Sequence, residues 1–148
     1  MDIPQLILTT MAALVALTIH EFAHGYVAYK LGDDTAKMMG RLSLNPIKHL
    51  DPFGAICMVL FHFGWAKPVP INPRNFKNPR SGFAISAMAG PATNLIVGFF
   101  TAFIYLLCLS TFRQVEATFL NNLQINILTF LQYFFIINVG LGIFNLIP

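Results

Sequence analysis

Three long apolar stretches dominate the chain. They run over Ile3–Leu31, Gly82–Ser110 and Asn122–Ile147, and the last two contain no charged residue. Each is longer than the roughly 20 residues that an α-helix needs to cross a bilayer. A fourth apolar run, Phe53–Phe63, has only 11 residues and predicts a re-entrant segment instead. The pattern therefore predicts an all-α membrane protein with three transmembrane helices and a re-entrant segment between the first and second.

The composition agrees with a membrane protein. Of the 148 residues, 56% are hydrophobic and 10% are charged, so the polar residues are too few to cover a water-soluble domain. The net charge of +3 could suggest nucleic acid as a partner, but most positive charges lie between two spans, where they set orientation. We expect the lipid bilayer and no nucleic acid as a partner, and a multi-pass location in the cell membrane.

The basic residues also predict a topology. Eight of the nine Lys and Arg residues lie from the end of the first stretch to the start of the second, so a membrane crossing by Phe53–Phe63 would separate two basic loops. A re-entrant segment keeps both loops in the cytoplasm, with the N-terminus and the loop around Arg113 outside and Pro148 at the cytoplasmic face. The first stretch lacks the basic leader of a signal peptide and is too long for one.

Two segments between the first and second spans have the pattern of short β-like strands. Gly40–Asn45 alternates weakly, and Trp65–Pro73 is extended by its prolines, which restricts it to an edge strand or a polyproline-like segment. A basic interfacial loop is the alternative for this region. We find no repeat and no linker, so residues 1–148 are predicted to form a single domain.

A possible metal site lies within the first span. Glu21 is the one charged residue in the middle of this span, between His20 and His24. An ionised group at bilayer depth costs several kcal/mol and marks function by default. Residues four apart on a helix project from one face, so the two imidazoles can share an ion with Glu21 beside it, as in a zincin. The alternative is a pair of core histidines with a hydrogen-bonded glutamate, and we expect His49 and His62 to pack at the interface rather than to bind metal.

The depth of a second polar group matches that of the motif. His20 and His24 lie about 10 to 16 Å from the cytoplasmic end of the first helix, and Gly90–Asn94 lies about 12 to 18 Å into the second. Glycine allows close helix approach and Asn94 adds a buried amide, which suits a polar cavity between helices. A Gly/Pro kink with Asn94 hydrogen-bonded to a neighbouring helix is equally compatible with these residues.

Several motifs in order resemble the site-2 protease family of intramembrane zinc metalloproteases. They are His20–His24, Ala89–Asn94, Gly64–Pro70 with Arg74–Phe76, and Asn145–Pro148. The resemblance covers nearly the whole chain and is closest to the compact prokaryotic type without a PDZ domain. It implies a metalloprotease core domain.

The resemblance also implies roles for individual residues. His20 and His24 would bind Zn²⁺, and Glu21 would be the catalytic base. The third ligand of the family is an aspartate just beyond the element that matches Asn145–Pro148, so we expect the 148 residues to be an incomplete fragment without it. A catalytic zinc site normally takes three protein ligands. Asp51, His49 or an asparagine are weaker candidates for the third position.

We therefore predict a zinc metalloendopeptidase that cleaves transmembrane proteins or peptides by zinc-activated water, with its active site toward the cytoplasmic side. Asn94 or Asn145 would hold the substrate or its oxyanion. Trp65, Pro68 and Val69 would pair with the unwound substrate by β-strand addition. The alternatives are a catalytically inactive scaffold or pseudoprotease that binds helices, and a metal or proton transporter, for which the chain offers only three spans.

Overall fold

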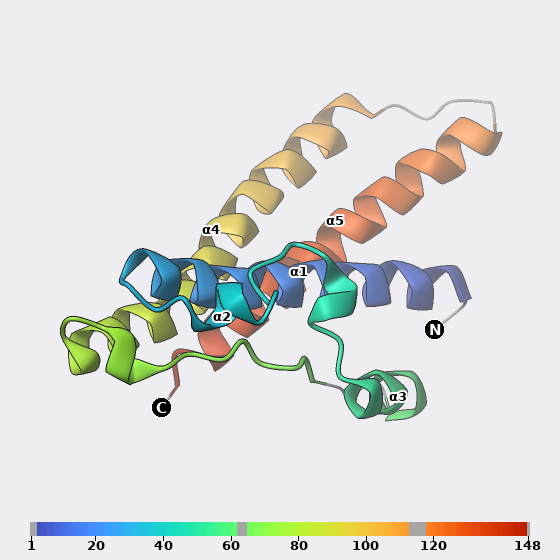
Figure 1. Ribbon diagram of the computed structural model, residues 1–148. Helices are drawn as coiled ribbons and strands as arrows, with labels where there is room; N and C mark the ends of the chain where they lie inside the picture. Colours follow the sequence, from blue (N-terminus) through green and yellow to red (C-terminus); the bar gives the residue numbers. More distant parts are fainter. Residues whose placement is uncertain (1–2, 62–64, 113–117, 148) are drawn as a thin grey trace. The chain divides into compact units, whose positions relative to one another are not determined.

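The described part of the chain is mostly α-helical, with five α-helices joined by loops and two short 3₁₀ helices (Figure 1). The computed structural model describes residues 3–61, 65–112 and 118–147. The α-helices are α1 (Ile3–Lys30), α2 (Thr35–Met38), α3 (Pro52–Phe61), α4 (Pro79–Thr111) and α5 (Thr118–Phe144), and the short 3₁₀ helices are η1 (Pro46–Lys48) and η2 (Pro73–Asn75).

The three predicted transmembrane helices are confirmed by length and composition. α1, α4 and residues Phe119–Phe144 of α5 are each long and apolar enough to cross a membrane. α4 begins at Pro79 rather than at Gly82. Proline is favoured in the first helical turn because an N–H there would have no acceptor within the helix, so its absence costs nothing, and because the φ of proline suits a helix. Hydropathy alone does not detect this polar first turn.

The described part of the short apolar run, as far as Phe61, forms a helix that by itself is too short to span a bilayer. α3 has 10 residues, and the Asp51 carboxylate accepts a hydrogen bond from Gly54 N at 2.9 Å in its first turn. Phe53, Ile56 and Leu60 are exposed on this helix. Its length agrees with the prediction of a non-spanning segment, and a re-entrant course through the membrane stays a prediction.

The predicted β-like strands between the first and second spans are wrong. Within the described residues the structure has no strand, and Leu50 and Ala66 form one isolated antiparallel bridge. The physical reason lies in the prolines. Pro46 starts a 3₁₀ turn, and Pro68 and Pro70 carry no N–H with which to extend a ladder.

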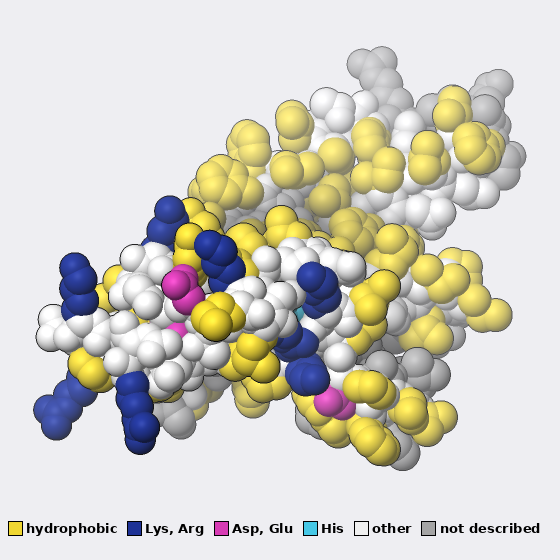
Figure 2. All heavy atoms as spheres, viewed as in Figure 1, with side chains coloured by type: hydrophobic (Ala, Val, Ile, Leu, Met, Phe, Trp, Pro, Cys, Tyr) yellow, Lys and Arg dark blue, Asp and Glu magenta, His cyan; other side chains and the backbone are white. Residues whose placement is uncertain are grey.

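The chain groups into two compact units. One consists of Met1–Ala16 with Asn94–Pro148, and the other of Leu17–Thr93. Lys and Arg side chains gather over α2 and the loops of the second unit, whereas hydrophobic side chains predominate on the visible faces of α4 and α5 (Figure 2). This distribution agrees with lipid around the long helices and water near the connecting segment. The single domain predicted for residues 1–148 stays a prediction.

The second unit, Leu17–Thr93, is packed around the C-terminal half of α1. A Cβ placed on Gly25 would lie 3.0 Å from Val69 Cγ1, 3.4 Å from Ala36 Cβ and 3.5 Å from Leu42 Cδ1. Because glycine has no side chain, three separate segments come within contact distance of α1 at this point. Phe76 packs in the same way against Gly82 at the start of α4. These contacts fix the connecting segment onto the helix that carries the histidines.

A buried carboxylate organises the turn after α1. Asp33 is fully buried, and its Oδ1 accepts hydrogen bonds from Thr35 N, Thr35 Oγ1 and Asn75 Nδ2 at 3.1, 2.5 and 2.7 Å. Its Oδ2 accepts one from Asn72 N at 2.7 Å. Burial by itself raises the pKa of Asp33, but the hydrogen bonds from Thr35, Asn72 and Asn75 outweigh it and lower the pKa below the usual value. The ionised carboxylate therefore joins α1, α2 and η2.

In the other unit, α4 and α5 approach closely. A Cβ on Gly98 would lie 3.0 Å from Val139 Cγ2. Asn138 is fully buried beside this contact and donates through Nδ2 to Phe134 O at 2.8 Å. A small residue at the closest point is typical of helix packing in membranes, where dispersion contacts provide much of the attraction.

Candidate metal centre

The two histidines of α1 converge as predicted. His20 Nε2 and His24 Nε2 are 3.0 Å apart, and the ring planes meet at 85° with centroids 4.6 Å apart. Two imidazole nitrogens bound tetrahedrally to zinc at 2.0–2.1 Å are separated by about 3.3 Å. The His20 side chain is buried, at 4% exposure. The pair therefore fits zinc with a shift of a few tenths of an ångström.

A backbone carbonyl of α4 sets the proton position on His24. His24 Nδ1 lies 2.7 Å from Ser86 O. A carbonyl oxygen can only accept, so Nδ1 carries the proton and Nε2 presents its lone pair. Metal-binding histidines usually donate their second ring nitrogen in this way. The ring is therefore held in the tautomer that a metal ligand needs.

Gly90 lies directly against both imidazoles. A Cβ at this position would be 2.4 Å from His24 Nε2 and 2.8 Å from His20 Cε1. The α4 backbone therefore forms a wall of the site, and any side chain larger than hydrogen at position 90 would enter the space between the rings. The matching depths predicted for these residues are confirmed by this contact.

Glu21 points to the segment that follows α3. Its Oε2 accepts a hydrogen bond from Val69 N at 2.8 Å, and the side chain is half-buried. Val69 is 8% exposed, whereas Trp65 and Pro68 are exposed. The segment from Trp65 to Ile71 thus lies beside the predicted base, and its role in substrate binding stays a prediction.

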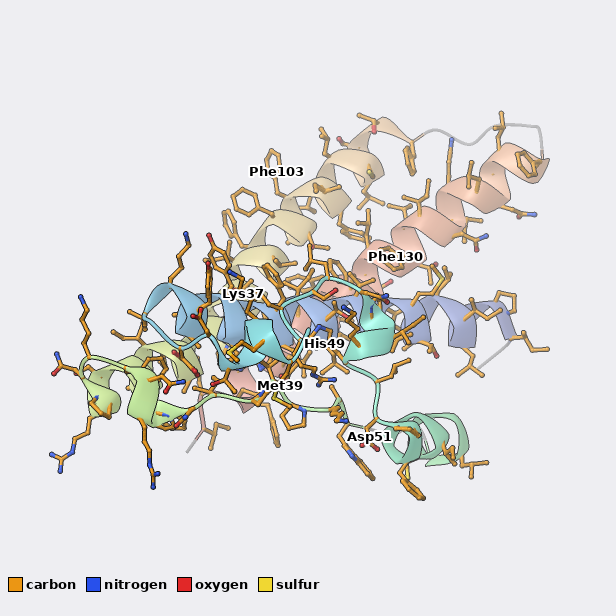
Figure 3. The ribbon with its side chains drawn as sticks, in the orientation of Figure 1. Lys37, Met39, His49, Asp51, Phe103 and Phe130 are labelled. Atoms are coloured by element: carbon orange, nitrogen blue, oxygen red, sulfur yellow. The ribbon has the colours of Figure 1, made fainter. Side chains whose placement is uncertain are left out.

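The described residues do not provide a third ligand. No group of three His, Cys, Asp or Glu side chains is placed to hold a metal ion within 3–61, 65–112 and 118–147. His49 and Asp51 lie on the loop between η1 and α3 (Figure 3), where His49 Nε2 bonds Ser43 O at 2.6 Å and Asp51 caps α3. His62 falls outside the described residues. Among the described residues, the candidate ligands are therefore His20 and His24.

The two asparagines assigned to substrate binding differ in their surroundings. Asn94 is fully buried, and neither its Oδ1 nor its Nδ2 has a hydrogen-bond partner within the described residues. Asn145 is exposed and donates from Nδ2 to Leu141 O at 2.8 Å. A buried amide without a partner is costly, and such groups occur where a water or ligand binds. Both assignments stay predictions.

Sequence reasoning missed Ser86 and Arg41. Ser86 lies one helical turn before Gly90, so the spacing of four that runs through Gly82, Ser86, Gly90 and Asn94 could have identified it. Arg41 donates to the carbonyls of the Lys67 segment. Its sequence context gave no signal, because the contact joins residues 26 apart in an irregular region.

Known proteins of similar sequence carry the name of a zinc metalloprotease. The chain is 46% identical over 145 residues to "Putative zinc metalloprotease YwhC" of Bacillus subtilis, which covers 98% of the chain and 63% of that protein. It is 29% identical over 96 residues to "Putative zinc metalloprotease Rip2" of Mycolicibacterium smegmatis, covering 62% of the chain and 37% of that protein. The chain thus spans less than two thirds of the length of either relative.

These similarities are consistent with the resemblance to the site-2 protease family. No family model and no solved structure matches the chain. The names of the relatives support a zinc metalloprotease, and with the three apolar helices they support a multi-pass membrane protein. The convergence of His20 and His24 agrees with zinc as the metal.

Proposed function

We propose that the full-length protein is an intramembrane zinc endopeptidase of the site-2 type. The observation that carries this proposal is the pair of convergent Nε2 atoms 3.0 Å apart, with the His24 tautomer set by Ser86 O. Both histidines lie within a helix long and apolar enough to cross a membrane. A histidine pair in such a helix has little reason to exist without a polar function.

Each residue of the motif has a role in the proposed reaction. His20 and His24 would hold the zinc, which when bound would supply Lewis acidity toward a water molecule and a peptide carbonyl. In the proposed reaction Glu21 would act as the general base that takes the proton of the attacking water. We expect the third ligand to come from outside the described residues.

The proposed substrate is a transmembrane segment of another protein or peptide. A substrate helix hides its amides in hydrogen bonds and must unwind before it can be cut. We propose that the extended segment from Trp65 to Ile71, which contacts Glu21 through Val69, binds the unwound chain. Asn94 is proposed to hold the substrate oxyanion, since its buried amide has no other partner within the described residues.

The proposed site faces the cytoplasmic side. Eight of the nine Lys and Arg residues lie between Lys30 and Arg80, within the unit that also contains His20, Glu21 and His24. By the positive-inside rule this basic segment stays in the cytoplasm.

Substitution of Glu21 tests the proposal. In purified full-length protein, Glu21→Gln should lower cleavage of a transmembrane reporter peptide by at least about 100-fold, because general base catalysis contributes 10²–10⁴-fold. Zinc content, measured by elemental analysis, should stay near that of the wild type, whereas His20→Ala should lose zinc. Asp34→Asn is the matched control, since Asp34 is exposed and its removal also deletes one negative charge. A Glu21→Gln protein that still cuts the reporter refutes the mechanism.

An inactive helix-binding scaffold is the second candidate. It is favoured by the two-histidine ligand set within the described residues. Full-length wild-type protein that binds zinc and the reporter but does not cleave it would support the scaffold over the protease.

A further inference from the structure

The segment after α3 is anchored to α1 at two adjacent turns. Val69 N donates to Glu21 Oε2 at 2.8 Å, and Val69 Cγ1 lies 3.0 Å from the position of a Cβ on Gly25. Glu21 and Gly25 are four residues apart, so both contacts are on one face of the helix. The side chain and the amide of one residue thus fix the segment against the predicted base.

Val69 is the only residue of its triplet that can make the bond to Glu21. It is flanked by Pro68 and Pro70, which have no backbone N–H. The two prolines also restrict the backbone on either side. The segment therefore presents one amide to the carboxylate from a stiff support.

Arg41 also holds this segment in place. Its Nη2 donates to Lys67 O at 2.5 Å and to Pro68 O at 3.3 Å, and its Nη1 donates to Lys48 O. Lys67 N donates to His49 O at 2.8 Å. A planar guanidinium with several donors suits such a group of carbonyls, which a lysine ammonium would not bind in the same geometry.

We propose that Arg41 and Val69 are positioning residues for the Glu21 carboxylate. Arg41 binds the carbonyls of Lys67 and Pro68 and so fixes the backbone just before Val69. The Val69 amide in turn donates to Oε2 of Glu21. The other oxygen, Oε1, then faces a defined direction from which to take a proton. This inference rests on the proposed function, since it gives the base of that reaction its orientation. Catalytic groups held by a second set of hydrogen bonds react faster because less ordering remains to be done.

The same contacts limit which backbone groups of this segment can pair with a substrate strand. Lys67 N, Lys67 O, Pro68 O and Val69 N are already bonded within the protein. The N–H groups of Lys67 and Val69 have no second hydrogen to donate, so a substrate strand cannot accept from them without displacing His49 O or Glu21. Residues 67–69 therefore act as a fixed support, and a substrate strand can pair here only through the second lone pairs of the carbonyls or through backbone groups outside these residues.

Removal of the Val69 amide tests the orientation directly. Val69→Pro deletes the donor, and Val69→Ala keeps the donor while shortening the side chain, so the difference between them isolates the hydrogen bond. In full-length protein we expect kcat of Val69→Pro to fall about 10- to 100-fold below that of Val69→Ala, with KM and zinc content within about twofold. Arg41→Gln should lower kcat in the same way, and Arg41→Lys should recover only part of it.

Hydrogen exchange gives a second measurement that does not depend on cleavage. Residues 68–70 contain a single backbone amide, that of Val69, because the other two residues are prolines. We expect Glu21→Ala and Arg41→Gln each to speed its exchange at least about tenfold. Asp34→Asn, at an exposed site outside this network, should leave it as in the wild type.

The outcomes separate this inference from the proposed function. If the wild type cleaves the reporter but Val69→Pro matches or exceeds Val69→Ala, the positioning role is refuted while the protease assignment stands. Unchanged Val69 exchange in Glu21→Ala refutes it as well. If the wild type binds zinc but does not cleave, the proposed function fails and the positioning role fails with it, whatever the exchange data show.

Discussion

Gly90→Ala should disable the metal site by the addition of one methyl group. The new Cβ would lie 2.4 Å from His24 Nε2, 2.7 Å from His24 Cε1 and 2.8 Å from His20 Cε1, whereas ordinary contacts begin at 3.4 Å. The His24 ring or the α4 backbone must therefore move by about 1 Å. Metal–ligand distances tolerate only about 0.2 Å. We expect zinc affinity to fall at least about tenfold.

The expected effect on stability separates this clash from the usual effect of the substitution. Gly→Ala inside a helix normally stabilises by up to about 1 kcal/mol, because the unfolded chain loses freedom. Overpacking costs about 1 to 3 kcal/mol, so at position 90 the net change should be close to zero or destabilising. Gly140→Ala is the matched control. Gly140 also lies in a long helix, and a Cβ there would meet nothing within 4 Å.

Zinc titration and thermal unfolding of the full-length protein in detergent would measure both effects. The wild type and Gly140→Ala should bind zinc alike and gain thermal stability on binding. Gly90→Ala should show a smaller gain at the same zinc concentration. If Gly90→Ala binds zinc as tightly as the wild type, the inferred contact between α4 and the imidazoles is wrong.

Two further predictions concern stability. Asp33→Asn should lower the free energy of unfolding by about 1 to 3 kcal/mol. The new amide nitrogen would stand where Asp33 Oδ2 now accepts a hydrogen bond from Asn72 N, and two donors would then face each other. The folded pKa of Asp33 lies below the usual 3.8, so its contribution to the free energy of unfolding is complete above pH 3.8 and is lost as the pH falls below that value. The free energy of unfolding should therefore fall more steeply with acid in the wild type than in Asp33→Asn, and equal slopes would contradict this prediction. Gly98→Ile should destabilise the packing of α4 on α5 by about 1 to 3 kcal/mol, since even a Cβ there lies 3.0 Å from Val139 Cγ2. Gly140→Ile has open space at its Cβ and serves as the control; equal unfolding temperatures for the two variants would argue against the contact.

The long-range periodicity of the sequence predicted the parts that depend on regular helices. The spacing of His20 and His24 was sufficient because residues four apart share a helix face. The match in depth between α1 and Gly90 followed from a fixed rise per residue. Both predictions use geometry that is the same in every α-helix, so no knowledge of the loops was needed.

The contacts of the connecting segment could not be predicted in this way. Glu21 and Val69 are 48 residues apart, and Val69 lies in a proline-rich segment with no period. Arg41 reads as one of several basic loop residues, although its guanidinium binds three carbonyls. The β-like strands were predicted from weak alternation, and the prolines that limit pairing also prevented a ladder.

At position 86 the His24 ring bonds a main-chain oxygen rather than a side chain. At position 90 the imidazoles fit against α4 because glycine has no side chain. The bond to His24 should therefore survive exchange of Ser86 for another small residue that fits this fully buried position, provided that α4 keeps its path. Position 90 has no such tolerance. Among distant relatives, an invariant glycine one turn after a variable residue would be the trace of this arrangement, and a survey restricted to conserved polar side chains would overlook it.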